Sequence, residues 1–449
     1  VRIIFLMTPD IPFNQRVPPG VVMPDLKAMY RTIVQDDFPD TLTITLGDTV
    51  LAYAKRTWDI DGERKGLRYG ENPDQPAALY QPVSGRFVAA GKNWRDSAGG
   101  KAVISALSEA QMLQAGKHPG KTNLTDVDNG CNILQYLAER PAAVILKHNN
   151  PCGAAWSSAS VGDALTKAFW CDRIAAFGGA VVVNRPLDMK AAELIAANYF
   201  EVVAAPDFTP EILHILASRK NLRIFKLPAL ADLGRLAGEP FLEIKALMDG
   251  GLVLQQSFVN RIRCATDFLP AVASAKDGTS VSARKPTEQE ADDLLFAWAV
   301  EAGVSSNSVI FAKNGATVAI GTGEQDRVGC VEIAIFKART KFADTLAFTR
   351  HGLTLYELKQ QAADNAEAAA RLADIEAETE QRKGGLEGSV VVSDGFFPFR
   401  DGVDLCVAQG VTAIAQPGGS LRDHEVIAAV NEAVPQVAMV FTGQRSFRH

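Results

Sequence analysis

The chain has 449 residues, of which 47% are hydrophobic and 22% are charged, and these values indicate a globular protein of two or three domains and exclude a disordered chain. The formal net charge of −6 gives no basis for a nucleic-acid-binding surface or a nucleic-acid partner, so a nucleotide ligand would have to be held by local cations. Six scattered cysteines without CxxC spacing, and no apolar run near the roughly 20 residues that span a bilayer, predict a reduced, cytoplasmic protein outside the membrane.

Residues 1–65 are expected to form an N-terminal arm. The segment PFNQRVPPGVVMP is rich in proline and is followed by a short helical pattern near residues 24–36. The first residues lack both the long apolar region and the cleavage site of a signal peptide. From about residue 66, apolar runs alternate with helical patterns, which is typical of an α/β protein. We expect a first subdomain over 66–266, a weakly apolar linker over 267–284 and a second subdomain over 285–449.

Short apolar runs predict the strands, and 3.6-residue periodicity predicts the helices. The expected strands are 142–148, 176–184, 201–206, 308–313, 317–323, 389–394, 411–416 and 437–442. The expected helices are 103–115, 161–170, 188–198, 287–302, 353–382 and 422–433. Asn314-Gly315 separates two strands by two residues, which is a strong hairpin signal. Residues 353–383 are rich in Ala, Glu and Gln and predict a long, largely solvated helical insertion.

The segment LRYGENPDQPAALY (67–80) displays Arg68 and Tyr69 just before a glycine and an Asn-Pro turn. Taken alone, it fits an exposed turn with a surface arginine somewhat better than a ligand site. The alternative is a phosphate clamp, because the guanidinium fork matches phosphate oxygens.

Two glycine-rich segments are not the nucleotide-binding motifs that they superficially resemble. GKHPGKTNLTDVD (116–128) has three residues between its glycines, whereas a P-loop needs four. GTGEQDR (321–327) has Asp326 where a dinucleotide-binding fingerprint has its third glycine. Both motifs are therefore excluded.

The segment AAVILKHNNPCGAA (142–155) ends an apolar run with Lys147 and His148. Such runs are typical of central parallel strands, and ligands of open α/β sheets bind outside the carboxyl ends of strands. A catalytic pair and a structural lysine beside a hydrogen-bonded histidine explain it about equally well. Zinc deaminases have a glutamate two residues after the histidine and a second cysteine after Pro-Cys, and here neither Asn150 nor the residues after Cys152 match.

Three C-terminal segments also carry polar groups after predicted strands. SDGFFPFRDGVD (393–404) combines aromatic side chains with an arginine and three acids. In QPGGSLRDHEV (416–426), Ser420 and Asp423 resemble a helix cap, and the exposed N–H groups could hold an anion. FTGQRSFRH ends the chain with Arg445 and Arg448, and both a site and a frayed terminus remain possible.

Taken together, these segments resemble one enzyme family, in order from about residue 38 to the last residue. The matching motifs are RYGENP, KHNNPCG, AFGGAVVVNR, SNSVIFAKN, SDGFFPFRDGVD, QPGGSLRD and FRH. They resemble the formyltransferase part of the bifunctional purine biosynthesis enzyme. That part transfers a formyl group to 5-aminoimidazole-4-carboxamide ribonucleotide (AICAR). The resemblance implies two related cytidine-deaminase-like α/β/α subdomains without zinc, and an intertwined homodimer with the active site at its interface.

The resemblance also implies roles for individual residues. Lys147 and His148 would be the catalytic pair. The AICAR-binding residues would be Arg68, Tyr69, Asn123, Phe177, Gly178, Asn307 and Arg445. The residues facing the co-substrate 10-formyltetrahydrofolate would be Glu201, Arg327, Phe396, Asp401 and Ser420. A structural potassium ion is compatible with the family as well.

The implied chemistry suits these residue types. The 5-amino group of AICAR is a poor nucleophile, because its lone pair is delocalised into the ring and the carboxamide. Formyl transfer to it needs close positioning, a base for the proton that is lost and a cation for the developing charge. We expect His148 to be the base and Lys147 to be the electrostatic partner and acid.

This chain departs from the family pattern in several places. Only about 66 residues precede LRYGE, and FPDTL (38–42) alone resembles the end of the family's cyclohydrolase domain. We therefore expect formylation without ring closure, which would leave that step to a separate IMP cyclohydrolase. Gly120 stands where serine is usual, and Glu324 and Asp326 add acids beside Arg327. A zinc-dependent hydrolase and a catalytically silent, nucleotide-binding regulatory homologue are the alternatives.

Overall fold

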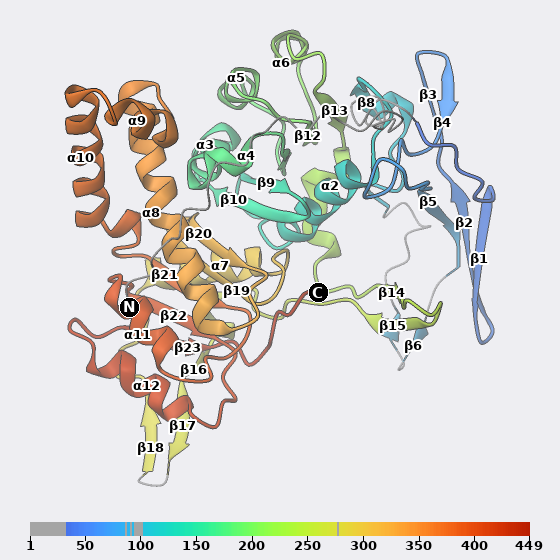
Figure 1. Ribbon diagram of the computed structural model, residues 1–449. Coiled ribbons are helices and arrows are strands. Elements are labelled where there is room, and N and C mark those ends of the chain that lie inside the picture. Colours follow the sequence, from blue (N-terminus) through green and yellow to red (C-terminus); the bar gives the residue numbers. More distant parts are fainter. Residues whose placement is uncertain (1–32, 86–87, 90–91, 94–101, 276–277) are drawn as a thin grey trace, which may run out of the picture.

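The computed structural model describes residues 33–85, 88–89, 92–93, 102–275 and 278–449, and its centre is one mixed sheet of twelve strands (Figure 1). The strand order is β16-β23-β22-β21-β19-β20-β10-β9-β11-β12-β13-β8. The strands of one half are β8 (Met112–Gln114), β9 (Ala142–Lys147), β10 (Asn150–Trp156), β11 (Ala180–Val183), β12 (Val202–Ala205) and β13 (Arg223–Lys226). Those of the other half are β16 (Leu269–Pro270), β19 (Ser308–Lys313), β20 (Ala316–Thr322), β21 (Val390–Ser393), β22 (Ala413–Gln416) and β23 (Ala438–Phe441).

The two halves repeat one arrangement of elements. Each begins with a helix of 14 residues, continues with an antiparallel hairpin and then adds three parallel strands, each of which follows a helix. The helices of the first half are α2 (Lys121–Leu134), α3 (Val161–Cys171), α4 (Arg173–Ala176), α5 (Met189–Ala197) and α6 (Pro210–Leu216). Those of the second half are α7 (Glu288–Glu301), α8 (Arg327–His351), α9 (Leu355–Ala362), α10 (Ala366–Gln381), α11 (Asp401–Ala408) and α12 (Asp423–Glu432). The halves join where β10 pairs with β20, which makes the sheet continuous.

Apolar side chains on alternating sides of the strands fill two helical layers. On one face, a single cluster contains residues of α2, α7 and both halves of the sheet. On the other face, the first half packs against α3, α5 and α6, and the second half packs against α8, α11 and α12. The alternation along β9 shows this division, because Val144 belongs to the shared cluster and Ile145 to the other face.

All eight predicted strands are confirmed within a few residues, and so is the Asn314-Gly315 hairpin, which joins β19 and β20. The prediction of a parallel β9 is wrong, because β9 pairs antiparallel with both β10 and β11. The helix predicted at 103–115 is also wrong. That segment contains a short 3₁₀ turn and β8, which pairs with β13 at the edge of the sheet.

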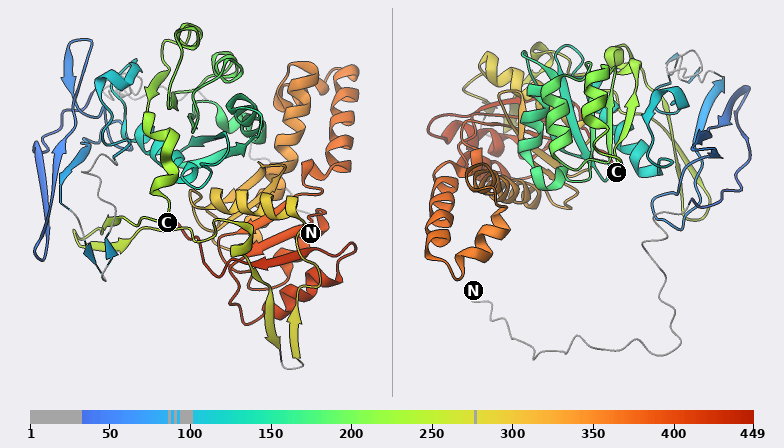
Figure 2. Two further views of the ribbon diagram at one scale, coloured as in Figure 1. Left: turned by 180° about the vertical axis from the view of Figure 1, so that it is seen from behind. Right: turned by 90° about the horizontal axis from the view of Figure 1, so that it is seen from above.

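Three other predicted segments contain more structure than their sequence suggests. Part of the N-terminal arm forms β1 (Thr41–Leu46), β2 (Thr49–Lys55), β3 (Trp58–Ile60) and β4 (Glu63–Lys65), while the helix expected near 24–36 lies largely outside the described residues. The linker carries β16 and the hairpin of β17 (Val272–Ala275) and β18 (Gly278–Val281). The single helix expected at 353–383 is two helices, α9 and α10, which share a small apolar cluster with α8 (Figure 2).

A hairpin of β14 (Leu242–Ala246) and β15 (Leu252–Gln256) extends from the body of the protein (Figure 1). All five residues of β15 are exposed, and they include Leu252, Val253 and Leu254. Met248, in the turn, is fully exposed. The hairpin therefore presents an unusual amount of apolar surface. Within the described ranges, no helix has the length and apolar character needed to cross a membrane.

Candidate functional site

Most of the predicted site residues lie along one edge of the twelve-stranded sheet. In the first half, this edge holds the turn after β9 and the residues that precede β11, β12 and β13, because β9 runs antiparallel to β11. In the second half, it holds the start of β19 and the carboxyl ends of β21, β22 and β23. The rule that ligands bind at the carboxyl ends of parallel strands therefore describes only the second half.

Lys147 and His148 stand at the centre of this edge. Lys147 is the last residue of β9, and its Nζ donates to the carbonyl oxygen of Phe177 over 2.8 Å. His148 is exposed, and with Asn149 it forms the two-residue turn to β10. Both turn residues have positive φ, 55° and 61°, as a type I′ hairpin turn requires. Because neither is glycine, this turn carries strain that its surroundings must hold in place.

Asp126 of α2 holds this turn by a hydrogen bond to its backbone. Its Oδ1 accepts a hydrogen bond of 2.6 Å from the backbone N–H of Asn149. Burial raises the pKa of Asp126 to about 6, although the Asn149 N–H and the nearby His148 oppose the rise. Sequence analysis did not select Asp126. Its only signal was a carboxylate within the polar segment 116–128, for which no helix was predicted and which contains the start of helix α2.

Two buried guanidinium groups lie on the first-half side of the turn. Arg68 and Arg223 are 8% and 5% exposed, and neither forms an ion pair with a described carboxylate. The side chain of Arg68 donates to the Tyr69 hydroxyl over 2.8 Å, while its Nε is buried without a partner. Burial and the positive charge of Arg68 lower the pKa of Arg223 to about 10. Two adjacent buried cations favour an anion between them.

Arg223 was also missed by sequence analysis. It is the first residue of β13, and the only signal was a cation at the start of an apolar run, which is common on protein surfaces. The fold gives it significance by placing it beside Arg68.

Asn123 and Glu201 are joined at the same side of the edge. Asn123, in the first turn of α2, donates to Glu201 Oε2 over 3.0 Å and accepts from the backbone N–H of Gly120. Gly120 lies against the ring of Tyr69, where a Cβ would come within 3.3 Å. Phe177 is 63% exposed and stacks on Tyr199 with the ring centroids 4.9 Å apart. Gly178 follows with a φ of 77°, a conformation that favours glycine.

Asn307 and Arg327 form a buried network on the second-half side. Arg327 donates to the side chain of Asn307 over 2.8 Å, to the Ser308 carbonyl and to Asp394. Its guanidinium therefore orients Asn307 and neutralises the fully buried Asp394. The extra acid Asp326 is the N-cap of α8 and accepts from Gly329 N–H, so its position has a structural explanation.

Arg445 differs from Arg327 because it is exposed and forms no ion pair with any carboxylate in the described ranges. Its guanidinium lies over the rings of Phe396 and Phe447, at 5.1 and 5.6 Å from their centroids. The three side chains form a flat cation–aromatic surface next to the Asn307 network.

Asp401 and Ser420 lie after β21 and β22 on the same edge. Asp401 is exposed at the start of α11, and Ser420 accepts a hydrogen bond from the Arg422 N–H. The anion site expected at Ser420 is wrong, because the carboxylate of Asp423 already accepts from the N–H groups of Gly419 and Ser420. Helix α12 begins at Asp423, so Ser420 is not its cap.

Arg448, the penultimate residue of the chain, joins the two groups of side chains. It donates to the carbonyl oxygens of Asn149 and Gly303, at 3.2 and 2.9 Å, and Asn129 of α2 donates to the same two oxygens. Asn150 adds a second link by accepting from the Ser305 N–H. The turn that carries His148 is thus held by both halves.

Nothing in the described ranges groups three His, Cys, Asp or Glu side chains closely enough to hold a metal ion. Cys152 donates to the Ile145 carbonyl, and burial raises the pKa of its thiol well above the usual value. Both oxygens of Asp394, the buried carboxylate at the edge, already accept hydrogen bonds from Arg327 and Ser306. The potassium ion stays a prediction.

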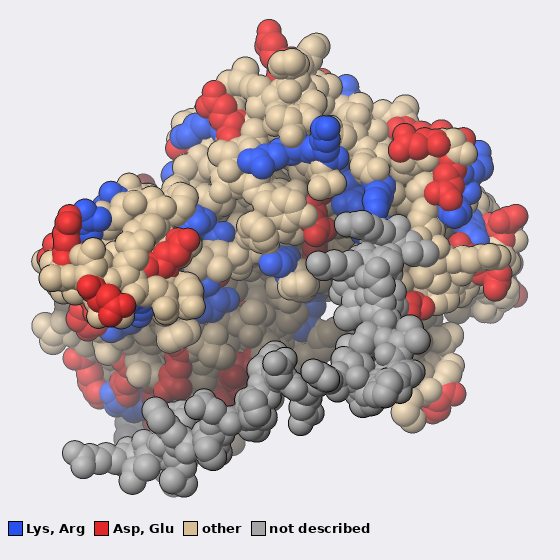
Figure 3. Space-filling view, turned by 45° about the horizontal axis from the view of Figure 1, so that its top comes forward, with Lys and Arg blue, Asp and Glu red and all other residues tan. Residues whose placement is uncertain are grey.

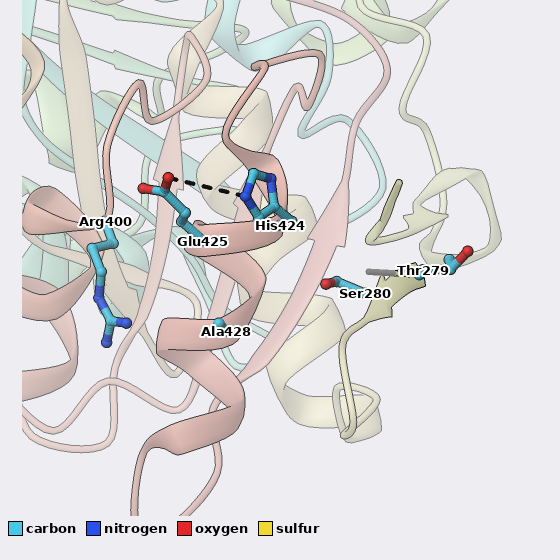
Figure 4. Close-up of a pocket in the computed structure, with 7 residues that line it drawn as sticks. Thr279, Ser280, Arg400, His424, Glu425 and Ala428 are labelled. Atoms are coloured by element: carbon cyan, nitrogen blue, oxygen red, sulfur yellow. Dashed lines mark ion pairs between the residues drawn. The ribbon is translucent and has the colours of Figure 1, made fainter. Parts of the chain in front are cut away.

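A pocket of about 400 Å³ lies elsewhere, between β18 and α12 (Figure 4). It is lined by Thr279, Ser280, Arg400, His424 and Glu425, and Arg400 is already paired with Asp404 and Glu432. None of the predicted site residues lines it. Positive and negative side chains are intermixed over most of the face in Figure 3, and a short band of Lys and Arg side chains lies near its upper centre.

Comparisons with known proteins identify relatives of this chain. The family described as "AICARFT/IMPCHase bienzyme" matches residues 27–337. The bifunctional purine biosynthesis protein PurH of Cereibacter sphaeroides is 38% identical over 386 residues, which cover 85% of this chain and 59% of that protein. The proteins of that name from Acidithiobacillus ferrooxidans and Rhodospirillum rubrum are 37% and 39% identical, over 92% and 86% of this chain. The chain thus spans about 60% of the length of these curated relatives.

Proposed function

We propose, since the chain belongs to the AICARFT/IMPCHase bienzyme family, that it transfers the formyl group of 10-formyltetrahydrofolate to the 5-amino group of AICAR in the cytoplasm. The observation that carries this proposal is the Lys147–His148 turn, which lies between an anion-binding pair of arginines and an exposed cation–aromatic surface. Each element suits one part of the reaction.

The reaction forms a bond from the 5-amino nitrogen to the formyl carbon and breaks the bond from that carbon to folate N10. The amino nitrogen loses a proton, and N10 gains one. His148 is the base for the first proton, because imidazole is the commonest general base in enzymes and this side chain is exposed at the edge. The Lys147 ammonium, oriented by Phe177, stabilises the charge on the formyl oxygen and delivers a proton to N10.

The ribotide phosphate binds at Arg68 and Arg223, with Tyr69 beside it. This assignment is supported by the burial of both guanidiniums without a carboxylate partner among the described residues. Asn123 faces the ribose or the carboxamide in this proposal. Glu201, which sequence analysis assigned to the folate, is reassigned to the same side because Asn123 donates a hydrogen bond to it.

The folate binds on the second-half side, where Phe396 and Phe447 offer their rings to its pterin ring or its benzoyl group. Arg445, which sequence analysis assigned to AICAR, is reassigned to the folate because its guanidinium lies over both rings. Arg327 acts through Asn307, which it orients, because both of its terminal guanidinium nitrogens already donate to Asn307, Ser308 and Asp394. Asp401 and Ser420 remain candidates for the outer part of this site.

The proposal includes a homodimer. The apolar hairpin β14–β15, together with exposed Phe241 and Leu247, is best covered by a second copy of the chain. A two-stranded hairpin in which most residues are exposed is also only marginally stable alone, so a partner surface would stabilise it.

The test is an absorbance assay for tetrahydrofolate release from 10-formyltetrahydrofolate, with AICAR as acceptor. The matched control is the AICAR nucleoside, which has the same amino group and no phosphate. We expect release that depends on AICAR and is much slower with the nucleoside. A protein that binds AICAR and releases no tetrahydrofolate would be the silent regulatory homologue, and the proposal would fail.

A further inference from the structure

The two halves of the sheet carry the same three-part device at opposite edges. In each half, the first strand of the antiparallel hairpin (β9 or β19) ends in a lysine, and a two-residue left-handed turn follows. An aspartate at the sixth position of the helix before that hairpin (α2 or α7) accepts from a backbone N–H of the turn. The aspartates are Asp126 of α2 and Asp293 of α7, and the turns are His148-Asn149 and Asn314-Gly315.

One difference separates the two copies. The second copy has Asn314 where the first has His148, so the second aspartate supports a turn that cannot titrate. Its Gly315 also packs against the indole of Trp156, where a Cβ would come within 2.2 Å. The second copy therefore lies under a buried tryptophan, while His148 of the first is exposed on the functional edge. Both aspartates hold their turns through backbone N–H groups. Only the turn held by Asp126 contains an ionisable side chain, that of His148.

Asp126 is 7% exposed and lies close enough to His148 for their charges to interact. The other charged groups that affect it are Glu201, which precedes β12, and Lys121 of the same helix. Asn149 joins Asp126 to His148 through its backbone, so the carboxylate fixes both the position and the electrostatic environment of the imidazole.

We infer that Asp126 is a positioning residue for His148, which holds the turn through Asn149 and stabilises the imidazolium that forms when His148 accepts the amino proton. The stabilisation of the imidazolium during catalysis rests on the proposed function. The charge coupling between the two side chains is a property of the protein without substrate.

The experiment compares two matched variants of the 449-residue protein, Asp126→Asn and Asp293→Asn. Asp126→Asn keeps the one oxygen that accepts from its turn and loses the charge, whereas Asp293→Asn loses the charge and also one of two acceptors for its turn, so it is the stricter control for a purely structural effect. We expect Asp126→Asn to lower kcat about tenfold or more with little change in KM, and Asp293→Asn to leave both constants unchanged. Thermal unfolding of both variants shows whether a loss of activity has a structural origin.

The second readout is the titration of the His148 ring by NMR, assigned among the six histidines by its absence from His148→Gln. Removing the carboxylate should lower the pKa of His148 by about half a unit or more. An unchanged His148 titration in Asp126→Asn, or an equal loss of kcat in Asp293→Asn, would overturn the inference. If the wild type shows no formyl transfer, the proposed function fails, and the titration still decides whether Asp126 acts on His148.

Discussion

Lys147 and Lys313 occupy equivalent positions in the two halves of the sheet and make the same contact. Lys147 is the last residue of β9, and Lys313 is the last residue of β19. The Nζ of Lys147 donates to the Phe177 carbonyl oxygen over 2.8 Å, and the Nζ of Lys313 donates to the Glu387 carbonyl oxygen over 2.7 Å. In both cases, a glycine with positive φ follows the acceptor. The contact is therefore part of the repeated scaffold, and what distinguishes Lys147 is its place beside His148 on the functional edge.

This equivalence gives a prediction for Lys147→Met and Lys313→Met. Both variants should lose about 1 kcal/mol of unfolding free energy in urea, because each loses one hydrogen bond. Only Lys147→Met should lose activity, by about 100-fold in kcat, because only its ammonium faces developing charge. Equal kcat values for the two variants would show that the Lys147 charge has no part in the chemistry.

Asp126→Asn should be more stable than the wild type at pH 7.5. Burial raises the folded-state pKa of Asp126 from the ordinary 3.8 to about 6, so the carboxylic acid suits the fold better than the carboxylate. Asp126 therefore does not reduce the free energy of unfolding below pH 3.8, where it is protonated in both states. Between pH 4 and 6 it reduces the free energy of unfolding increasingly, and above pH 6 the reduction reaches its full value of about 3 kcal/mol. Urea unfolding of both proteins at pH 5 and 7.5 measures the difference. A gain that is larger at pH 5 would contradict this account.

Arg448→Ala should destabilise the protein by about 2 kcal/mol, because it removes donors to the carbonyl oxygens of Asn149 and Gly303. It should also reduce kcat, since the turn that holds His148 loses one of its supports. The matched control is Arg445→Ala, whose exposed side chain should change stability by less than about 0.5 kcal/mol and weaken substrate binding instead.

Arg68→Ala and Arg223→Ala should each raise the KM for AICAR by about tenfold or more, because a charge-assisted contact to phosphate is lost. Neither should affect the weak reaction with the AICAR nucleoside. Arg219→Ala, an exposed arginine at the end of the preceding loop, is the control and should behave as wild type. Equal effects on nucleotide and nucleoside would place the phosphate elsewhere.

Met248→Asp or Leu254→Asp should dissociate the dimer that we propose, because each substitution places a charge on the apolar hairpin. Sedimentation velocity measures the mass, and Tyr356→Asp on α9, another exposed hydrophobic position, is the control. A wild-type chain that sediments as a monomer at micromolar concentration would exclude the dimer.

The buried strands were predictable from sequence because their signal is local. Runs such as those of β9 and β19 are apolar on both faces and end at turns, whatever their neighbours are. Their direction was not predictable in the same way. An antiparallel β9 gives the same apolar run as a parallel one, and only the hairpin formed by His148-Asn149, which lacks glycine, distinguishes them.

Helix α2 was the main element missed. Its buried face carries Asn123, Asp126 and Asn129, polar residues that locally favour loops and are here stabilised by Glu201, Asn149 and Gly303. These partners are distant in sequence, so tertiary contacts outweigh local propensity. The same reason explains why Asp126 and Arg223 were missed while Lys147 and His148 were selected.

We propose that the Lys147–His148 turn performs formyl transfer to AICAR. The most direct measurement uses 10-formyltetrahydrofolate with a ¹³C-labelled formyl group, incubated with AICAR and either the wild type or His148→Ala, and follows the label by NMR. We predict that the label appears on the 5-amino nitrogen of AICAR with the wild type, and at least about 100-fold more slowly with His148→Ala. Label transfer at the same rate with both proteins, or no transfer with the wild type, would contradict the account.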